Sequence, residues 1–332
     1  MKKLLIVTDA WRPQVNGVVT TLETVIRLLR EHGHEVTVIS PDMFNTVPLP
    51  VYPEIKLAVL PRRKIARTID TLAPDSIHIA TEGPLGWTTR AVCLKNGWRF
   101  STSYHTKFPE YAYETARIPL RVGYRLVRHF HQKSSAMMVA TKSLKDDLTN
   151  RGLANAVTWS RGVDTQLFKP GYKPAINLKK PVMVYVGRVS VEKNIEAFLG
   201  LDIPGSKLVV GGGPQLERLK SKYPDVTFTG PKFGNELAAH YCSGDIFVFP
   251  SQTDTFGLVM LEAMACGLPV AAYPVTGPID VLEGCEAGKM DSDLTTATLQ
   301  ALKADGNSAR SHALKFSWES CTEVFLSNLV AR

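Results

Sequence analysis

One stretch limits the possible folds of this chain more than any other. It runs from Ser251 to Pro269 with the sequence SQTDTFGLVMLEAMACGLP. An apolar run at residues 245–249 precedes it and predicts a buried strand. Polar turn residues then lead into residues 258–266, which have the pattern of a helix that Gly267 and Pro269 end. The order of strand, polar turn and helix predicts an α/β fold.

The turn of this stretch has the properties of a site for phosphate or sugar oxygens. A helix N-terminus offers free N–H groups and a partial positive charge, and Gly257 has no side chain to keep a ligand away. Asp254 and Glu262 are eight residues apart, about 2.2 helical turns, so we expect them near one helix face with Glu262 deeper. Binding to sugar or ribose hydroxyls would explain these carboxylates; a capping Asp and a buried, hydrogen-bonded Glu is the alternative.

The spacing Asp-x7-Glu with Thr-Phe-Gly-Leu-Val inside it resembles the Glu-x7-Glu signature of family 4 retaining glycosyltransferases. Asp254 in the first position resembles the branch that contains sulfoquinovosyldiacylglycerol synthase and lipid alpha-mannosyl- and glucosyltransferases. The resemblance implies the GT-B fold, which consists of two Rossmann-like doubly wound domains facing each other across a cleft. It also implies that Asp254 orients the hydroxyls of the transferred sugar and that Glu262 binds the ribose.

A second motif, residues 187–194 with the sequence GRVSVEKN, follows an apolar run that predicts a strand at residues 181–186. A guanidinium and an ammonium group at such a strand-to-helix turn suit a diphosphate. In the family, the matching Arg188 and Lys193 hold the pyrophosphate of the donor. The alternative is that both are ordinary exposed cations.

The resemblance implies two sets of site residues and no metal or other cofactor. The catalytic set is His105, Arg188, Lys193 and Asp254. The donor-binding set is Gly17, Arg188, Lys193, Gly213, Gly230, Asp254, Phe256, Gly257, Leu258, Val259 and Glu262. Asp291 and Asp293 have the spacing of a metal-binding Asp-x-Asp in another glycosyltransferase fold, but they precede a helix pattern, which favours a capping role.

The first half opens with a strand, a helix and a strand, the beginning of a doubly wound sheet. No Gly-x-Gly-x-x-Gly follows the first strand, which argues against a dinucleotide site, and Gly17 precedes the helix in its place. His105 directly follows a predicted strand and resembles the acceptor-side His of the family; a structural imidazole is the alternative. Arg161 stands where the family has Asn, so the resemblance assigns its side chain no role.

The length of 332 residues suits two domains. We expect an N-terminal acceptor-binding domain at residues 1–165, a linker at 166–180, a C-terminal nucleotide-sugar-binding domain at 181–315 and, from the resemblance, a final helix at 316–332 that crosses back to the first domain. No apolar run approaches a membrane span of about 20 residues. The scattered cysteines and the absence of a leader pattern predict a cytoplasmic protein.

Positive charge is concentrated in the first half. Residues 1–165 carry +9 and residues 166–332 carry −1, which sum to the +8 of the chain. Arg117, Arg121, Arg125 and Arg128 are spaced four, four and three, which places them on one face of a predicted helix. This face is either a solvated basic surface or a docking surface for anionic lipid headgroups at the inner face of a membrane. No nucleic-acid-binding module is present, so we do not expect nucleic acid as a partner.

Together these features predict a metal-independent retaining glycosyltransferase. It would move a hexosyl group from a UDP- or GDP-linked sugar to an acceptor hydroxyl on a sugar or lipid, with a membrane glycolipid or diacylglycerol as the candidate. Three alternatives remain open: a nucleotide-sugar 2-epimerase on the same fold, a sugar phosphorylase, and a non-enzymatic binder of anionic polymers.

Overall fold

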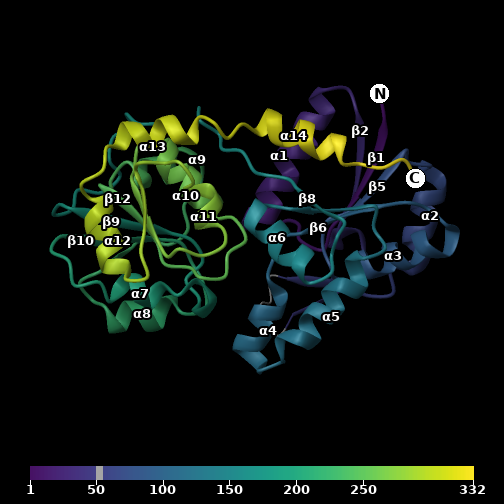
Figure 1. Ribbon diagram of the computed structural model, residues 1–332, viewed down its shortest axis with the longest axis horizontal. Helices are drawn as coiled ribbons and strands as arrows, with labels where there is room; N and C mark the ends of the chain where they lie inside the picture. Colours follow the sequence, from purple (N-terminus) through teal and green to yellow (C-terminus); the bar gives the residue numbers. More distant parts are fainter. Residues whose placement is uncertain (50–54) are drawn as a thin grey trace. The chain divides into compact units, whose positions relative to one another are not determined.

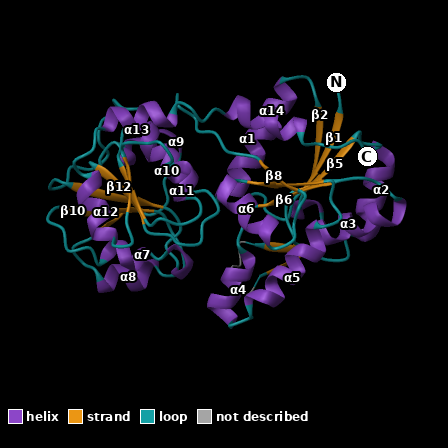
Figure 2. Cartoon of the chain, viewed as in Figure 1, coloured by secondary structure: helices purple, strands orange, loops and turns teal. Residues whose placement is uncertain are grey.

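The computed structural model describes residues 1–49 and 55–332, and it divides into two compact units (Figure 1). The first unit comprises Met1–Arg161 and Trp318–Arg332, and the second comprises Gly162–Ser317. Each unit contains a six-stranded sheet whose strands are all parallel, with helices on both sides (Figure 2). The predicted α/β class with two Rossmann-like domains is therefore confirmed.

The sheet of the first unit has the order β2-β1-β5-β6-β7-β8. Its strands are β1 (Lys3–Val7), β2 (Glu35–Ile39), β5 (Ser76–Ile79), β6 (Ser101–Tyr104), β7 (Ala136–Val139) and β8 (Ala156–Thr158). The chain order reverses between β1 and β5, and open sheets bind ligands at the carboxyl ends of the strands beside such a switch point. The smaller pair β3 (Thr46–Pro48) and β4 (Lys56–Ala58) is antiparallel.

Seven helices of the described residues belong to the first unit. They are α1 (Gly17–Glu31), α2 (Arg62–Leu72), α3 (Pro84–Asn96), α4 (Phe108–Ala116), α5 (Leu120–His131), α6 (Lys142–Asn150) and α14 (Trp318–Ser327). The last of these comes from the end of the chain and packs beside α1. The indole N–H of Trp159 donates a hydrogen bond to the Cys321 carbonyl (3.0 Å), which ties α14 to the end of the first sheet.

The sheet of the second unit has the order β11-β10-β9-β12-β13-β14, the strand order of a dinucleotide-binding sheet. Its strands are β9 (Val182–Val186), β10 (Ser206–Val210), β11 (Thr227–Phe228), β12 (Ile246–Phe249), β13 (Val270–Ala272) and β14 (Gly288–Met290). All residues of β9 and β12 are buried, as expected for central strands covered on both faces. The switch point lies between these two strands.

The helices of the second unit are short and follow the strands in turn. They are α7 (Ile195–Leu199), α8 (Leu216–Lys222), α9 (Gly234–Tyr241), α10 (Leu258–Ala265), α11 (Pro278–Val281), α12 (Leu294–Ala301) and α13 (Gly306–Ala313). Asp293 caps α12 by accepting bonds from the N–H groups of Thr295 and Thr296, as its position before a helix pattern predicted. Residues 166–180 also belong to this unit, where the N–H of Ala175 donates to the Ser243 hydroxyl (2.9 Å).

Two predictions about helices are wrong in detail. Arg117 does not share a helix with the other three arginines. It follows the end of α4 at Ala116 and has a φ of +54°, and α5 begins only at Leu120, after Pro119. The helix start predicted at residue 258 is confirmed, but Asp254 precedes it, so the 2.2 helical turns counted from Asp254 to Glu262 do not describe their arrangement. Across the described residues, no helix has both the length and the apolar character needed to cross a bilayer.

Candidate active site

Three loops meet at the switch point of the second sheet, after β9, β10 and β12. The N–H of Gly187 donates to the carbonyl of Val210 (3.0 Å), and the N–H of Val189 donates to the carbonyl of Gly212 (2.9 Å). Gly211 has a φ of +146°, and a Cβ there would lie 1.9 Å from the carbonyl oxygen of Gly187. Only glycine fits at this position, so the sequence Gly-Gly-Gly brings the loops after β9 and β10 into direct backbone contact.

A lysine and an aspartate join the loops after β9 and β12. The ammonium of Lys193 donates to Oδ1 of Asp254 in an ion pair. The two side chains are 24% and 18% exposed, so the pair is shielded but open to a ligand. Asn194 Nδ2 also donates to the carbonyl of Pro250 (3.1 Å), and the Thr253 hydroxyl donates to the carbonyl of Glu192 (3.3 Å). Residues 61 positions apart in the chain are thereby fixed beside each other.

Helix α10 starts at the same loop. Its N-cap is Gly257, whose φ is +91°, and a Cβ there would lie 2.9 Å from Cζ of Phe249. Leu258 and Val259 are partly exposed, whereas the side chain of Phe256 is buried. The free N–H groups at the start of α10 therefore lie in the loop that carries Asp254.

Glu262 lies one turn further along α10 and has a partner that the sequence did not predict. The hydroxyl of Tyr241, on α9, donates to Oε2 of Glu262 (2.8 Å). Burial raises the pKa of Glu262 to about 7, and the hydrogen bond from Tyr241 opposes this rise. The carboxyl group is therefore balanced between its protonated and ionised forms near neutral pH.

Two buried serines on these loops were also missed as site residues. The hydroxyls of Ser190 and Ser251 have no hydrogen-bond partner within the described residues. Ser190 follows Val189 in the loop after β9, and Ser251 follows β12 closely. A buried hydroxyl without a partner costs about 1–3 kcal/mol, so both positions fit a site that a polar ligand completes. Their place just beyond predicted strands was the available signal.

The remaining donor candidates of the second unit also lie on these loops. Arg188 is partly exposed, and its carbonyl accepts a bond from the Tyr185 hydroxyl (2.7 Å). Gly213 is exposed in the turn after β10, and the carbonyl of Gly230 accepts a bond from the N–H of Gly211 (3.0 Å). The structure thus brings the predicted donor residues 188–262 to one edge of one sheet.

Gly17 and His105 belong to the first unit. Gly17 is the first residue of α1, where the Asn16 side chain accepts bonds from the N–H groups of Val18 (3.0 Å) and Val19 (3.1 Å). At the switch point of that sheet, the Asp9 carboxylate accepts bonds from the N–H groups of Leu85 (2.9 Å) and Gly86 (3.3 Å). Burial raises the pKa of Asp9, and its bonds show that it positions the start of α3.

His105 follows β6 and is held by Arg161. Nη2 of Arg161 lies 3.1 Å from Nδ1 of His105, and a guanidinium can only donate, so Nδ1 accepts and the ring proton sits on Nε2. Burial, followed by the charge of Arg161, keeps the pKa of His105 well below its usual value. His105 is therefore a neutral imidazole whose Nε2–H is a donor.

Arg161 is itself buried, with 5% exposure, and it also donates to the carbonyl of Trp159 (2.5 Å). Burial lowers its pKa to about 10, so it stays charged at neutral pH. In the described part of the chain it forms no ion pair with a carboxylate.

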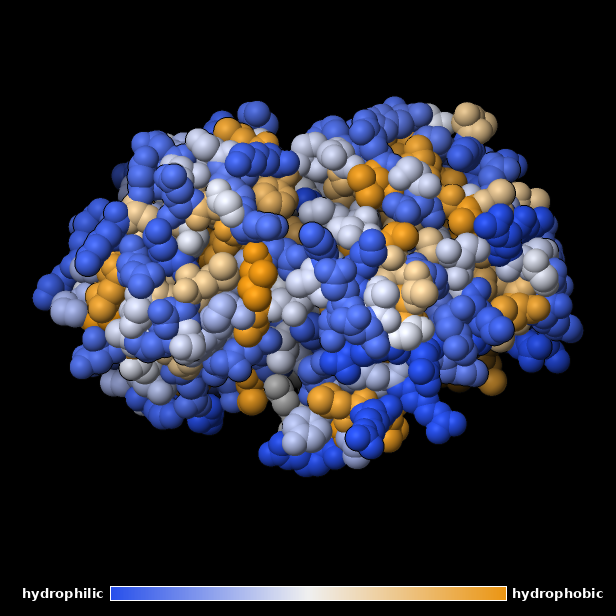
Figure 3. Space-filling view, in the orientation of Figure 1, coloured by the Kyte–Doolittle hydropathy of each residue, from blue (hydrophilic) through white to orange (hydrophobic). Residues whose placement is uncertain are grey.

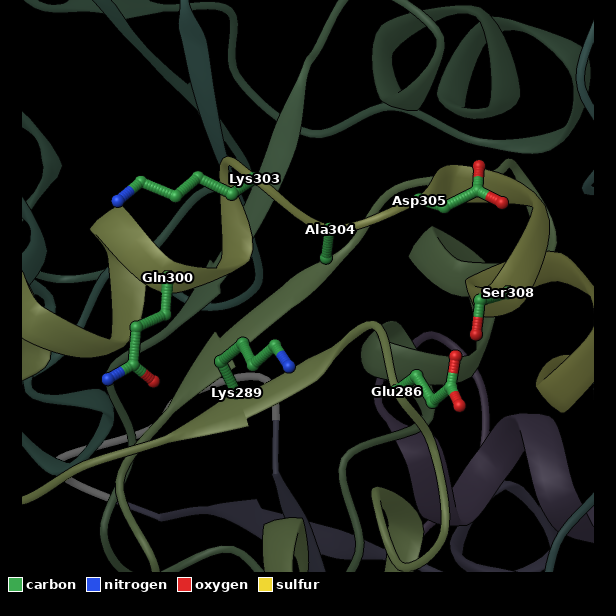
Figure 4. Close-up of a pocket in the computed structure, with 7 residues that line it drawn as sticks. All are labelled: Glu286, Lys289, Gln300, Lys303, Ala304, Asp305 and Ser308. Atoms are coloured by element: carbon green, nitrogen blue, oxygen red, sulfur yellow. The ribbon is translucent and has the colours of Figure 1, made fainter.

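Two surface cavities lie elsewhere in the second unit. One, of about 380 Å³, is lined by polar side chains that include Glu286, Lys289 and Lys303 (Figure 4). The other, of about 340 Å³, includes Cys242 and Asp245. Glu286 and Asp245 come just before β14 and β12, so both cavities lie at the amino ends of the strands, opposite the candidate site. Among the described residues, no cluster of three or more His, Cys, Asp or Glu could hold a metal ion.

Comparisons with known proteins agree over most of the chain. The family model Glycosyltransferase Family 4 matches residues 15–167, and Glycosyl transferases group 1 matches residues 180–303. A GDP-mannose-dependent alpha-mannosyltransferase from Mycobacterium tuberculosis is 31% identical over 84% of this chain and 81% of that protein. The sulfoquinovosyl transferase SQD2 of Arabidopsis thaliana is 30% identical over 93% of this chain and 69% of that protein.

Solved structures show the same fold. Sucrose-phosphate synthase from Thermosynechococcus elongatus has a TM-score of 0.76 at 20% identity, with 98% of both chains covered. Anabaena Alr3699/HepE in complex with UDP-glucose has a TM-score of 0.70 at 16% identity and covers 98% of this chain and 99% of that one. The fold and the loops of the second unit define a GT-B enzyme that transfers a sugar from a nucleotide sugar. The chain belongs to glycosyltransferase family 4.

Proposed function

We propose that this glycosyltransferase retains the anomeric configuration, works without a metal ion, and moves a hexosyl group from a UDP- or GDP-linked sugar to a hydroxyl of a membrane glycolipid or diacylglycerol. The contact between Lys193 and Asp254 beside the N-terminus of α10 carries the proposal. An ammonium group and a carboxylate lie next to each other there; the first suits a phosphate and the second suits sugar hydroxyls, which supports a site for the link between a diphosphate and a sugar.

The diphosphate is the leaving group, so the site must stabilise charge on its oxygens. Arg188 and Lys193 supply two positive charges, and the free N–H groups at the start of α10 supply hydrogen bonds and a partial charge. These groups replace the charge that a metal ion gives to other phosphate sites. The loop of Gly211 allows the phosphates to approach the backbone closely.

The sugar and the ribose are held by carboxylates and by His105. Asp254 accepts bonds from hydroxyls of the transferred sugar, and ionised Glu262 accepts bonds from the ribose. His105 donates from Nε2 to a sugar oxygen, since Arg161 occupies Nδ1. In this tautomer it is not a base at the reacting hydroxyl.

Retention follows from attack on the face of the leaving group. The bond between the acceptor oxygen and the anomeric carbon forms as the bond to the phosphate oxygen breaks on the same side. The acceptor proton passes to that phosphate oxygen, so no side chain of the enzyme becomes glycosylated. Mass spectrometry that traps a glycosyl adduct on a side chain would contradict this mechanism.

The relatives suggest which donors to test first. Their names specify GDP-mannose for the mycobacterial protein and a sulfoquinovosyl group for the Arabidopsis protein. Family membership disfavours the 2-epimerase and the anionic-polymer binder, because neither moves a sugar to an acceptor.

Nucleotide binding gives the first test. A ligand at about 100 times its dissociation constant adds about 2.7 kcal/mol to the free energy of unfolding, which raises the melting temperature by about 5–10 °C for a domain of this size. We expect UDP or GDP to stabilise the wild type in this way and the Arg188→Ala variant much less. Arg218→Ala is the control, because Arg218 is an exposed arginine of the same unit that pairs with Glu196. Equal stabilisation of all three proteins, or of none, would refute the donor site.

The tautomer of His105 can be tested without any substrate. Nitrogen-15 NMR of the imidazole, assigned with the His105→Gln variant, should show a protonated Nε2 and an accepting Nδ1 between about pH 5.5 and 8.5. In Arg161→Leu the ring loses its fixed partner and its cationic neighbour, so we expect the pKa of His105 to rise. A proton on Nδ1 in the wild type would show that the assigned tautomer is wrong.

A further inference from the structure

The helical hairpin of α4 and α5 exposes an unusual number of apolar side chains. Six large apolar residues between positions 108 and 126 are at least 37% exposed. They are Phe108, Tyr113, Ile118, Leu120, Val122 and Leu126. Val122 and Leu126 are 57% and 59% exposed, and they are one turn apart on the outer side of α5. Orange and blue side chains lie side by side over this hairpin in Figure 3.

The exposed side of α5 is not what anchors the helix to its unit. Tyr124, Val127 and Phe130 are buried and fix the helix against the sheet. The Tyr124 hydroxyl donates to Glu110 (2.5 Å), which ties α5 to α4, and the guanidinium of Arg151 lies 3.9 Å from the centre of the Tyr124 ring. The core of the unit therefore holds α5 rigidly while Val122 and Leu126 point away from it.

Positive charge runs along the same exposed side. Arg121 and Arg125 each precede one of the two aliphatic residues, so arginine and aliphatic side chains form two adjacent rows. From Thr115 to Lys145 the chain contains four arginines and three lysines and no Asp or Glu. Arg128 lies apart from these rows, since its Nη1 is close to Gly152.

We propose that this face, defined by Arg121, Val122, Arg125 and Leu126, binds an anionic lipid bilayer, with α5 lying in the plane of the headgroups. The aliphatic pair enters the boundary of the acyl chains, and the arginines bind lipid phosphates. The positive charge of the arginines favours an anionic partner. The aliphatic row favours a lipid over a nucleic acid, because proteins bind nucleic acids through aromatic side chains and polar contacts. This inference is independent of the acceptor named above.

Vesicle sedimentation tests the proposal with the full chain and no donor. We expect the wild type to bind vesicles of mixed phosphatidylglycerol and phosphatidylcholine, to bind pure phosphatidylcholine far less, and to be released by salt. Arg121→Gln with Arg125→Gln should weaken binding about 25-fold, since each basic residue near the surface contributes about fivefold. Val122→Ser with Leu126→Ser should weaken it about tenfold.

Matched variants locate the surface. Arg63→Gln with Arg67→Gln removes the same charge from α2, and Leu299→Ser with Leu314→Ser removes exposed leucines of the second unit; both should bind vesicles as the wild type does. Equal losses in these controls would overturn the proposal, as would no binding to phosphatidylglycerol. It would also fail if Val122→Ser with Leu126→Ser left vesicle binding unchanged while RNA bound through the same arginines. A third contrary result would be a dimer of the wild type that these two serine substitutions dissociate. Nucleotide-induced stabilisation reports on the donor site separately.

Discussion

Replacement of Lys193 by alanine is expected to lower kcat by about 10²–10³ while the protein stays folded. Removing one preorganised group that stabilises developing charge typically costs about 2.7–4 kcal/mol in the transition state. In the proposed site Lys193 would face the leaving diphosphate, and its partly shielded position makes such a charge act more strongly than in water. The ion pair with Asp254 is partly exposed, so its loss should change the free energy of unfolding by less than about 1 kcal/mol. Initial rates with excess donor measure the effect.

Two companion variants separate charge from position. Lys193→Arg keeps the charge and should recover part of the rate. The recovery is partial because a guanidinium is planar and larger than the compact ammonium group. Asp254→Asn should leave binding of the nucleotide diphosphate alone intact, because the proposal assigns Asp254 to the sugar, and should lower turnover of the intact donor. A Lys193→Ala enzyme with wild-type kcat would remove Lys193 from the catalytic set.

Replacement of Glu262 by glutamine is expected to stabilise the ligand-free protein and to weaken donor binding. The pKa of Glu262 is about 7 in the folded chain against 4.5 for an ordinary glutamate. At a pH between these two pKa values, Glu262 is ionised in the unfolded chain but still protonated in the folded chain. The free energy of unfolding therefore falls as the pH rises from about 4.5 to about 7, and the glutamate costs about 3 kcal/mol above pH 7. Glutamine has no such cost.

Denaturant unfolding at pH 5 and pH 8 measures this difference. We expect Glu262→Gln to exceed the wild type in stability by about 3 kcal/mol at pH 8 and by much less at pH 5. Tyr241→Phe removes the bond that favours the ionised carboxyl, so its stability should fall more steeply with pH than that of the wild type. The same pH dependence in wild type and Glu262→Gln would show that Glu262 does not titrate near neutrality.

The affinity for the donor should rise with pH, whereas the stability of the ligand-free protein falls with pH. Ribose hydroxyls donate to an ionised carboxylate, so binding releases a proton, and affinity should fall by up to tenfold for each pH unit below about 7. Losing the charged acceptor in Glu262→Gln should weaken donor binding about 30–100-fold, as expected for charge-assisted bonds worth about 2–3 kcal/mol. Calorimetry in buffers of different ionisation enthalpy measures both the affinity and the released proton. Donor binding unchanged in the variant would place the ribose elsewhere.

The sequence predicted the features that neighbouring residues encode. Each donor loop is a contiguous strand, turn and helix start, so the motifs around Arg188 and Asp254 could be located without coordinates. The contacts from Tyr241 to Glu262 and from Arg161 to His105 join residues 21 and 56 positions apart, and no local pattern reports them. The break at Arg117 was available in the sequence, because Pro119 stops a helix from continuing through it.

The start of α10 shows a different limit of prediction from the sequence. The sequence pattern placed the helix start at residue 258, where α10 begins, but the count of 2.2 helical turns extended helical geometry back to Asp254, across the left-handed backbone of Gly257. Asp254 is consequently free to reach across to the loop after β9, which a residue inside the helix could not do. Gly257 therefore decides where the carboxylate of Asp254 lies.

In the proposed function, the bond between Lys193 and Asp254 makes the site sensitive to two chemical groups at once. A free sugar offers hydroxyls to Asp254 but would separate it from its cation without giving that cation a phosphate. Inorganic diphosphate offers oxygens to Lys193 but leaves the carboxylate beside an anion. A nucleotide sugar presents both groups in one molecule and replaces both halves of the bond together. With the proposed roles of Lys193 and Asp254, such a site would bind a nucleotide sugar in preference to either a free sugar or inorganic diphosphate.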